Sequence, residues 1–147
     1  MTVRELNKRM QAVPLHRLTM AAIKLNEQEM LDMNRAQLQD HGIDSEGNDI
    51  WRRQPYTIFT QIEKISKGQP HDRVTLKDTG AFHKAFYMDV SSRVFNIDSR
   101  DSKSSSLKEK YGAEIFGLTP QNEQRAKEKN TRTLGRIWKE MVGLKGK

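Results

Sequence analysis

Apolar residues recur at helical spacing near the start of the chain. A short helix is predicted over residues 3–10, and Pro14 suits the first turn of the next helix. From Leu15 to about Asp40, one narrow stripe of apolar residues keeps the period of a long helix, which Gly42 ends. The stripe consists of Leu15, Leu18, Ala22, Ile23, Met30, Met33 and Leu38.

The end of the chain carries a second helical pattern. Thr119 is a typical N-cap residue, and Pro120 suits the first helical position, so a helix is expected to begin there and to run to about Gly143. Its apolar stripe consists of Ala126, Leu134, Ile137, Trp138 and Met141.

Between these helices the pattern changes. Thr57, or Tyr56 beside it, is expected to cap a short helix that places Ile58, Ile62 and Ile65 on one face. Residues 85–90 and 93–98 alternate as two strands, with Phe86, Met88 and Val90 facing Val94 or Phe95 and Ile97. We expect them to pair as a β-hairpin through a turn at Ser91–Ser92. A solvated linker with a short turn of helix follows, over residues 99–112.

These elements predict an α+β fold with a long N-terminal helix, a small antiparallel sheet and a C-terminal helix. The length of 147 residues suits a single domain, 1–147. Within it we distinguish an N-terminal helical part (1–41), a part with a loop, a short helix and a hairpin (42–118), and a C-terminal helix with a basic tail (119–147).

The loop "HGIDSEGNDIW" resembles a calcium-binding loop because acidic and amide residues surround Gly47. Placing Gly47 at the sixth position of an EF-hand puts Gly42 at the first and Arg53 at the twelfth, where carboxylates are required. We therefore interpret the loop as an Asx turn that exposes Gly47 and returns Trp51 to the core.

The composition adds a constraint on assembly. Hydrophobic residues make up 35% of the chain and charged residues 31%. A lone subunit therefore has few apolar residues with which to form a core, and it is expected to bury surface against other subunits. There are no cysteines, which excludes disulfides and thiolate zinc sites and fits a reducing cytosol. The first residues lack an apolar signal segment, and we expect no membrane association and synthesis in the cytoplasm.

The net charge of +7 is concentrated near the end of the chain, where residues 121–147 contain eight Lys or Arg and three Glu. Such a segment binds acidic protein surfaces or phosphate backbones, or it is a solvated helix face. Arg132, Arg136 and Lys139 are the candidate partner-binding residues.

The stretch "VTLKDTGAF" contains Asp78-Thr79-Gly80, the sequence with which aspartic proteases present a catalytic carboxylate. Leu134-Gly135-Arg136 imitates the second short motif of small dimeric proteases of this kind. However, Lys77 precedes the aspartate, the second motif lies in a charged helical segment, and much of the chain is predicted helix. We therefore interpret Asp78 as an Asx-turn residue and Gly80 as a flexible position, with Phe82 and Phe86 on one face of the helix that follows.

No other candidate chemistry emerges. The four histidines, His16, His41, His71 and His83, are not at metal-ligand spacing, and no glycine-rich phosphate loop precedes a helix. We expect no enzymatic activity, no metal and no cofactor.

The order of short motifs resembles the virion-morphogenesis or tail-completion (neck) proteins of tailed bacteriophages, including those of phages and prophages of Bacteroidetes. The resemblance covers about residues 20–142. The matching positions are Gly42, Ile43, Asp44, Gly47 and Trp51; Tyr56, Thr57, Lys64 and Lys67; Leu76, Asp78, Thr79, Gly80 and Phe82; Tyr111 and Gly112; and Phe116, Gly117, Leu118 and Thr119.

This resemblance implies an α+β subunit of a ring at the head–tail junction or tail end of a virion, assembled in the host cytoplasm. The ring is expected to be six-fold, with twelve-fold symmetry as the alternative, and to use its sheet as the ring body. Its partners are then other copies of itself, portal (connector) or tail-tube proteins, and DNA that passes through the lumen without sequence recognition. The resemblance also implies a strand around Phe116-Gly117-Leu118 before the last helix. A basic nucleic-acid-binding protein is the alternative function, and an aspartic-type protease a more remote one.

Overall fold

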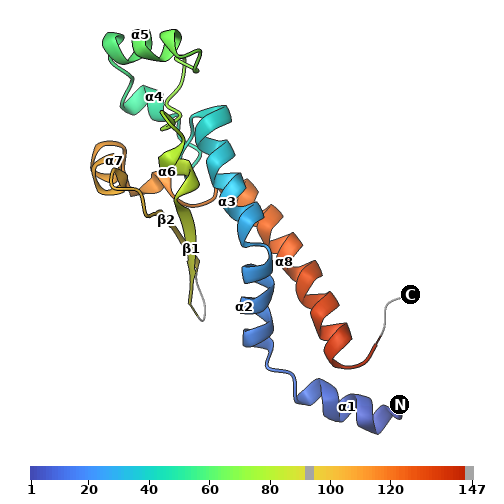
Figure 1. Cartoon of the computed structure of the whole chain (residues 1–147). Helices are drawn as coiled ribbons and strands as arrows, with labels where there is room; N and C mark the ends of the chain where they lie inside the picture. The colour runs from blue at the N-terminus through green and yellow to red at the C-terminus, as the bar shows by residue number, and fades with distance from the viewer. Residues whose placement is uncertain (92–94, 145–147) are drawn as a thin grey trace.

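The computed structural model describes residues 1–91 and 95–144, which form an α+β fold of eight α-helices and one two-stranded antiparallel sheet (Figure 1). The helices are α1 (Val3–Gln11), α2 (Leu15–Leu25), α3 (Glu27–Ala36), α4 (Ile50–Arg53), α5 (Ile58–Ser66), α6 (Ala81–Lys84), α7 (Ser104–Tyr111) and α8 (Pro120–Met141). The strands are β1 (Phe86–Val90) and β2 (Phe95–Ser99). A π-helical turn, η1 (Gln37–His41), follows α3, and a 3-10 turn, η2 (Ala113–Ile115), follows α7.

The predicted long N-terminal helix is interrupted. It divides at Asn26 into α2 and α3, and it ends in the π-helical turn η1 before Gly42, whose φ of 61° is left-handed. The Asn26 side chain turns to α8, where it donates to Asn130 Oδ1 (2.9 Å) and Thr133 Oγ1 (3.0 Å). Contacts with a distant helix thus override the local helical pattern at this position.

Helix α8 runs back along α3 and α2, and all three form the long body of the molecule (Figure 1). Its start agrees with the prediction, because Thr119 Oγ1 accepts a hydrogen bond from Asn122 N and Pro120 is the first helical residue. Its apolar stripe is less buried than expected. Ala126 is buried, but Trp138 is only half-buried, although α1 contacts this end of α8 through a hydrogen bond from Arg9 to Val142 O (3.4 Å).

The hairpin has the predicted alternation. Met88 pairs with Ile97, and Phe86 with Ser99, and these inward residues are buried. The predicted turn at Ser91–Ser92 includes Ser92, which lies outside the described residues, as does Val94. Phe82 and Phe86 do not share a helical face, because α6 ends at Lys84 and Phe86 begins β1. Their rings nevertheless meet edge to face at 5.1 Å.

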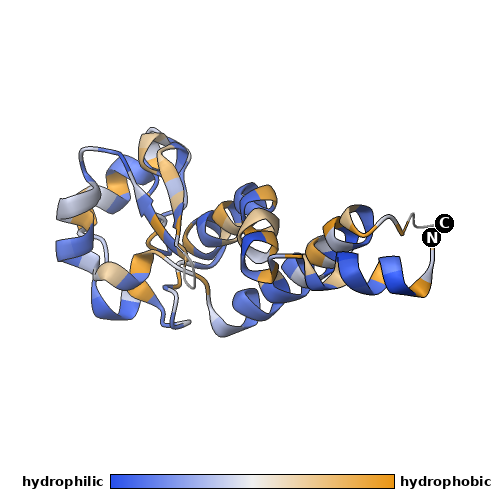
Figure 2. Cartoon of the chain, turned by 90° about the horizontal axis from the view of Figure 1, so that it is seen from below, coloured by the Kyte–Doolittle hydropathy of each residue, from blue (hydrophilic) through white to orange (hydrophobic). Residues whose placement is uncertain are grey.

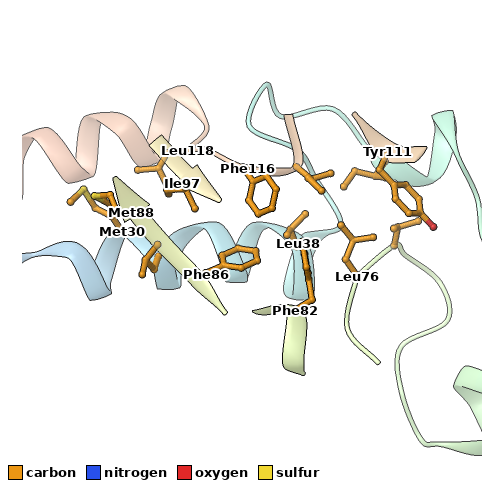
Figure 3. Close-up of a cluster of buried hydrophobic side chains, with 14 of the residues drawn as sticks. Met30, Leu38, Leu76, Phe82, Phe86, Met88, Ile97, Tyr111, Phe116 and Leu118 are labelled. Atoms are coloured by element: carbon orange, nitrogen blue, oxygen red, sulfur yellow. The ribbon is translucent and has the colours of Figure 1, made fainter. Parts of the chain in front are cut away.

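The core lies between α3, the hairpin, α6 and the segment before α8 (Figure 3). Its largest members include Met30, Leu38, Phe82, Phe86 and Phe116. Helix α1 and the end of α8 lie together at the opposite end of the molecule from α5 (Figures 1 and 2). None of the described helices is long and apolar enough to cross a bilayer.

Candidate functional site

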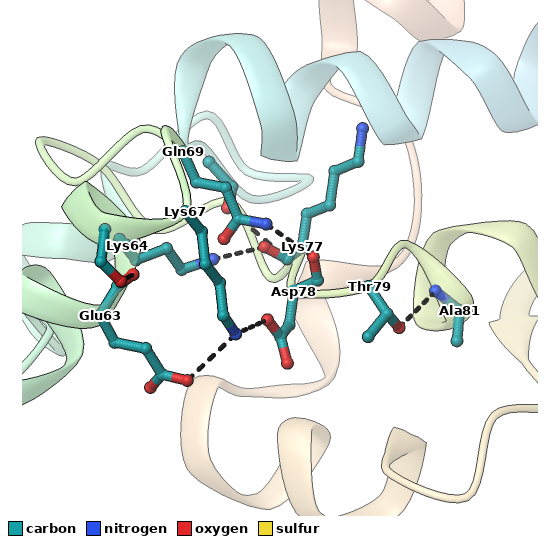
Figure 4. Close-up of polar contacts among 10 residues, drawn as sticks. Glu63, Lys64, Lys67, Gln69, Lys77, Asp78, Thr79 and Ala81 are labelled. Carbon is teal, nitrogen blue, oxygen red and sulfur yellow. Dashed lines mark hydrogen bonds and ion pairs between the residues drawn. The ribbon is translucent and has the colours of Figure 1, made fainter.

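The Asp-Thr-Gly sequence forms a turn on the surface beside α5. Asp78 accepts a charge-assisted hydrogen bond of 2.6 Å from Lys67 Nζ, and Lys67 also contacts Glu63 at 3.0 Å (Figure 4). Thr79 Oγ1 accepts from Ala81 N at 3.3 Å, and Gly80, with φ of 88°, precedes α6. The prediction of an Asx turn at Asp78 is therefore wrong, because the Asp78 carboxylate accepts from Lys67 and the Thr79 hydroxyl accepts from the backbone. The hydrogen bond from Lys67 lowers the pKa of the Asp78 carboxyl, so Asp78 stays ionised within an ion pair.

The same turn borders a small hollow. Its volume is about 180 Å³, below the range of about 300–1,000 Å³ typical of ligand pockets. Burial raises the pKa of Tyr111, which lines the hollow, to about 12. Leu134, Gly135 and Arg136, which imitate the second protease motif, lie in the helix α8 and not in a buried strand. This geometry fits a structural turn better than a pair of carboxylates that share a proton.

The loop after Gly42 is an Asx turn, as predicted. Asp44 is fully buried, and its Oδ1 accepts from Glu46 N (3.0 Å) and Asn48 N (2.9 Å). Gly47 lies in open space, and Trp51 packs against the edge of the core beside Tyr56, at 5.9 Å between ring centroids. Ile50, the residue before Trp51, is more completely buried.

The segment Phe116-Gly117-Leu118 bends at Gly117, whose φ is 108°, and is not a strand of the sheet, so the strand implied by the resemblance is absent here. Two buried amides of α3 and η1 take the place of a neighbouring strand. Asn34 donates to Ile115 O and accepts from Gly117 N, and Gln37 donates to Gly117 O and accepts from Thr119 N. Phe116 and Leu118 are thereby held in the core.

Helix α5 is the most unusual surface of the molecule. Thr57 caps it, as predicted, accepting from Thr60 N at 3.2 Å. Its apolar residues face solvent, because the exposed fractions are 77% for Ile58, 79% for Phe59, 60% for Ile62 and 57% for Ile65.

The inward side of α5 is polar instead. Lys64 is only 7% exposed, and its ammonium group donates to Lys77 O and lies 5.4 Å from the centre of the Tyr56 ring. A short helix that buries a lysine and exposes three isoleucines and a phenylalanine is oriented for a partner, since exposed apolar patches of this kind mark interaction sites.

The predicted partner-binding residues on α8 are exposed. Arg132, Arg136 and Lys139 follow one another at helical spacing on one face, and none of the three makes an ion pair with a described residue. Arg125 and Lys129 extend the same face, and Lys129 contacts Glu29 at 3.1 Å. These five residues, the basic stripe, cover several turns of α8.

The residue types that sequence reasoning passed over are buried amides and a buried lysine. Asn26, Asn34, Gln37 and Lys64 each make contacts far along the chain. For the three amides, the available signal was a polar residue at a position where the helical period favours an apolar one, whereas Lys64 lies off the stripe of Ile58, Ile62 and Ile65 and gave no such signal. Residues 1–91 and 95–144 contain no group of three or more His, Asp or Glu side chains arranged to hold a metal ion.

Comparisons with known proteins found no counterpart: no protein-family model, no curated protein and no solved structure matches the chain.

Proposed function

We propose that the protein is a structural subunit of a tailed-phage virion, located at the head–tail junction or tail end. There it joins connector and tail as one copy in a ring around the DNA channel. The order of motifs from Gly42 to Thr119 supports the phage assignment.

The observation that carries a structural role is the outward apolar face of α5. Exposing Ile58, Phe59, Ile62 and Ile65 to water is unfavourable for a free subunit, and a permanent neighbour removes that cost. A ring in a particle supplies such a neighbour for every copy.

Particle composition tests this proposal. Purified virions of the phage that encodes the chain are expected to contain the protein in multiple copies, and labelling with an antibody is expected to mark the neck or the tail end. Absence from the particles, or a single copy per particle, would contradict the proposal.

The basic stripe on α8 favours a second candidate function, binding of duplex nucleic acid. Arg125, Lys129, Arg132, Arg136 and Lys139 share one helical face that could follow a phosphate backbone. Titration of DNA binding against salt separates the two functions. A nucleic-acid-binding protein shows a steep linear fall of log affinity with log salt concentration, whereas a ring subunit that only surrounds DNA shows weak binding throughout.

A further inference from the structure

A hollow lies on the basic side of α8, where this helix passes the junction of α2 and α3 (Figure 1). Its volume is about 360 Å³, and it is lined by Asn26, Lys129, Arg132, Thr133 and Arg136. Three of these five residues are cations, and none is acidic. This hollow, which we call the basic hollow, therefore combines positive charge with hydrogen-bond donors, the two features that bind anions.

Most of the charge in the basic hollow is not neutralised by the protein. Arg132 and Arg136 lie one helical turn apart, and neither forms an ion pair within residues 1–91 and 95–144. Lys129 does contact Glu29, at 3.1 Å between Nζ and Oε1. Like charges four residues apart on a helix repel each other, so the two arginines are unfavourable neighbours until an anion lies between them.

Thr133 adds a buried donor to this lining. The hydroxyl groups of Thr19 and Thr131 each donate to the carbonyl four residues earlier in their helix, at 3.0 and 2.8 Å. Thr133 is only 7% exposed, and its Oγ1 accepts from Asn26 Nδ2 at 3.0 Å. Within the part of the chain that the structure describes, the Thr133 hydroxyl proton has no acceptor. It is therefore available to an oxygen atom of a ligand in the basic hollow.

Asn26 positions this donor and does not itself bind the ligand. Its Nδ2 carries two protons, which donate to Asn130 Oδ1 at 2.9 Å and to Thr133 Oγ1 at 3.0 Å. The donors left for a ligand are therefore the Thr133 hydroxyl and the three cationic side chains.

These donors suit a phosphate group. Guanidinium groups bind phosphate oxygens through paired, charge-assisted hydrogen bonds, and an ammonium or a hydroxyl group donates to the remaining oxygens. The basic stripe extends beyond the hollow to Arg125 and Lys139, about 21 Å along α8 at about 1.5 Å per residue. One DNA strand presents a phosphate about every 3.4 Å along the duplex axis, so about six phosphates span this length. A nucleic-acid backbone therefore matches the stripe better than a single small anion does.

We propose that the basic hollow binds one phosphate group of a nucleic-acid backbone. Arg132 and Arg136 supply charge-assisted hydrogen bonds, the Thr133 hydroxyl donates a further one, and Lys129 adds charge. A contact of this kind holds the backbone in place without reading its sequence. The inference rests on the second proposed function, the binding of nucleic acid, and names the site of its central phosphate contact.

The site is tested with two probes, inorganic phosphate and a short duplex DNA of arbitrary sequence. In NMR titrations at constant ionic strength, inorganic phosphate is expected to shift the backbone amide signals of Asn26 and Thr133, whereas chloride is not. Thr133→Val is expected to weaken the binding of both probes several-fold, because it removes the hydroxyl donor but keeps the shape of the side chain. Thr133→Ser keeps the hydroxyl and is expected to bind nearly as the wild type does.

Thr131→Val is the matched control for the loss of a hydroxyl group. Thr131 is exposed on α8 and does not line the basic hollow, so this variant is expected to bind both probes as the wild type does. Circular dichroism verifies that each variant is folded.

A double variant, Arg132→Gln with Arg136→Gln, tests the charges and does not depend on the stability of Thr133→Val. It is expected to lower the affinity for DNA about tenfold or more at low salt, and to reduce the slope of log affinity against log salt concentration by about two. Arg52→Gln with Lys84→Gln, at exposed positions on α4 and α6, removes the same net charge outside the stripe and is expected to keep the wild-type slope.

Wild-type binding of both probes by Thr133→Val, or an equal loss for the two double variants, overturns the proposal. Binding of inorganic phosphate without binding of DNA also overturns it, because the ligand is then a free phosphate. These outcomes are separate from those of the proposed function. Steeply salt-dependent DNA binding that survives all of these substitutions keeps the nucleic-acid function and excludes the basic hollow as its site. A wild-type protein that binds neither probe loses both.

Discussion

At the scale of single residues, the protein uses polar side chains to hold its backbone. In the sequence, Asp44 resembles a calcium ligand and Asp78 resembles a catalytic acid. In the structure, each carboxylate instead binds other groups of its own chain. Asp44 accepts from two backbone amides, and Asp78 pairs with Lys67. Asp44 sets the turn that precedes α4, whereas Asp78 links its turn to α5 through Lys67.

Asp78→Asn is expected to leave the fold and particle assembly nearly normal. Asparagine keeps an oxygen that accepts from Lys67, and the ion pair that it loses is exposed to solvent, where such pairs contribute little. Urea unfolding and particle yield measure the effect. Loss of a proteolytic activity in this variant would instead support the protease alternative.

His83 is expected to make stability depend on pH. It is buried, its Nε2–H donates to Thr75 O at 2.9 Å, and burial lowers the pKa of its imidazole below the usual value of 6.5. The unfolded chain therefore binds a proton that the folded chain does not. Stability is expected to fall as the pH drops through about 6.5.

Urea midpoints measured between neutral and mildly acidic pH test this. His83→Gln is expected to lower stability but to flatten its pH dependence in that range. His16→Gln, at an exposed position on α2, is the control and is expected to keep the wild-type slope. If His83→Gln keeps that slope as well, another group is responsible.

At the scale of elements, the chain repeatedly departs from regular geometry where a distant contact stabilises the departure. The break at Asn26 serves α8, and the π-helical turn directs both Gln37 and Leu38 inward. Because Gln37 then binds Gly117 and Thr119, the segment before α8 is fixed without a third strand. The π-helical turn η1 thus places the Gln37 side chain where a third strand would otherwise hydrogen-bond to the segment before α8.

Asn34→Ala is expected to destabilise the subunit by about 2 kcal/mol or more. It leaves Ile115 O and Gly117 N without their partner, and an unsatisfied buried polar group costs about 1–3 kcal/mol. Urea unfolding measures the loss, with Gln124→Ala on the exposed face of α8 as the control. If Asn34→Ala lowers stability no more than Gln124→Ala does, the hydrogen bonds of Asn34 to Ile115 and Gly117 are not needed for stability.

Trp138→Ala is expected to destabilise the subunit by about 1–3 kcal/mol. Truncation of a fully buried Trp typically costs about 3–5 kcal/mol, and Trp138 is only half-buried. The urea midpoint again provides the measurement. An unchanged midpoint would mean that this end of α8 gains its stability only in the assembled particle.

At the scale of the whole molecule, two exposed surfaces of the described residues stand out. One is the apolar face of α5, and the other is the basic stripe on α8. Their chemistry differs, which suits a subunit that contacts its own copies through one surface and an acidic neighbour through the other.

Reversal of Arg132 and Arg136 to Glu is expected to leave the subunit folded but to impair docking to a neighbouring ring, and so to lower the yield of infectious particles. Both side chains are exposed and unpaired with described residues, so the change acts on partners rather than on folding. Arg4→Glu with Lys8→Glu on α1 makes the same change in net charge and is the control. Wild-type yield for the Arg132 and Arg136 variant would indicate that the stripe is only solvated.

The sequence by itself determined the features that depend on neighbours along the chain. The caps at Thr57 and Thr119, the Asx turn at Asp44 and the alternation of the hairpin all follow from local hydrogen bonding and side-chain period. Only the tertiary structure decided which apolar faces are buried. The period of α5 places its isoleucines on one side, but that side faces solvent because Lys64 finds a backbone carbonyl and a tyrosine ring in the interior. The interruption of the helix at Asn26 and the hydrogen bonds of Asn34 likewise depend on partners about 80 to 110 residues away in the sequence. No local pattern specifies such contacts.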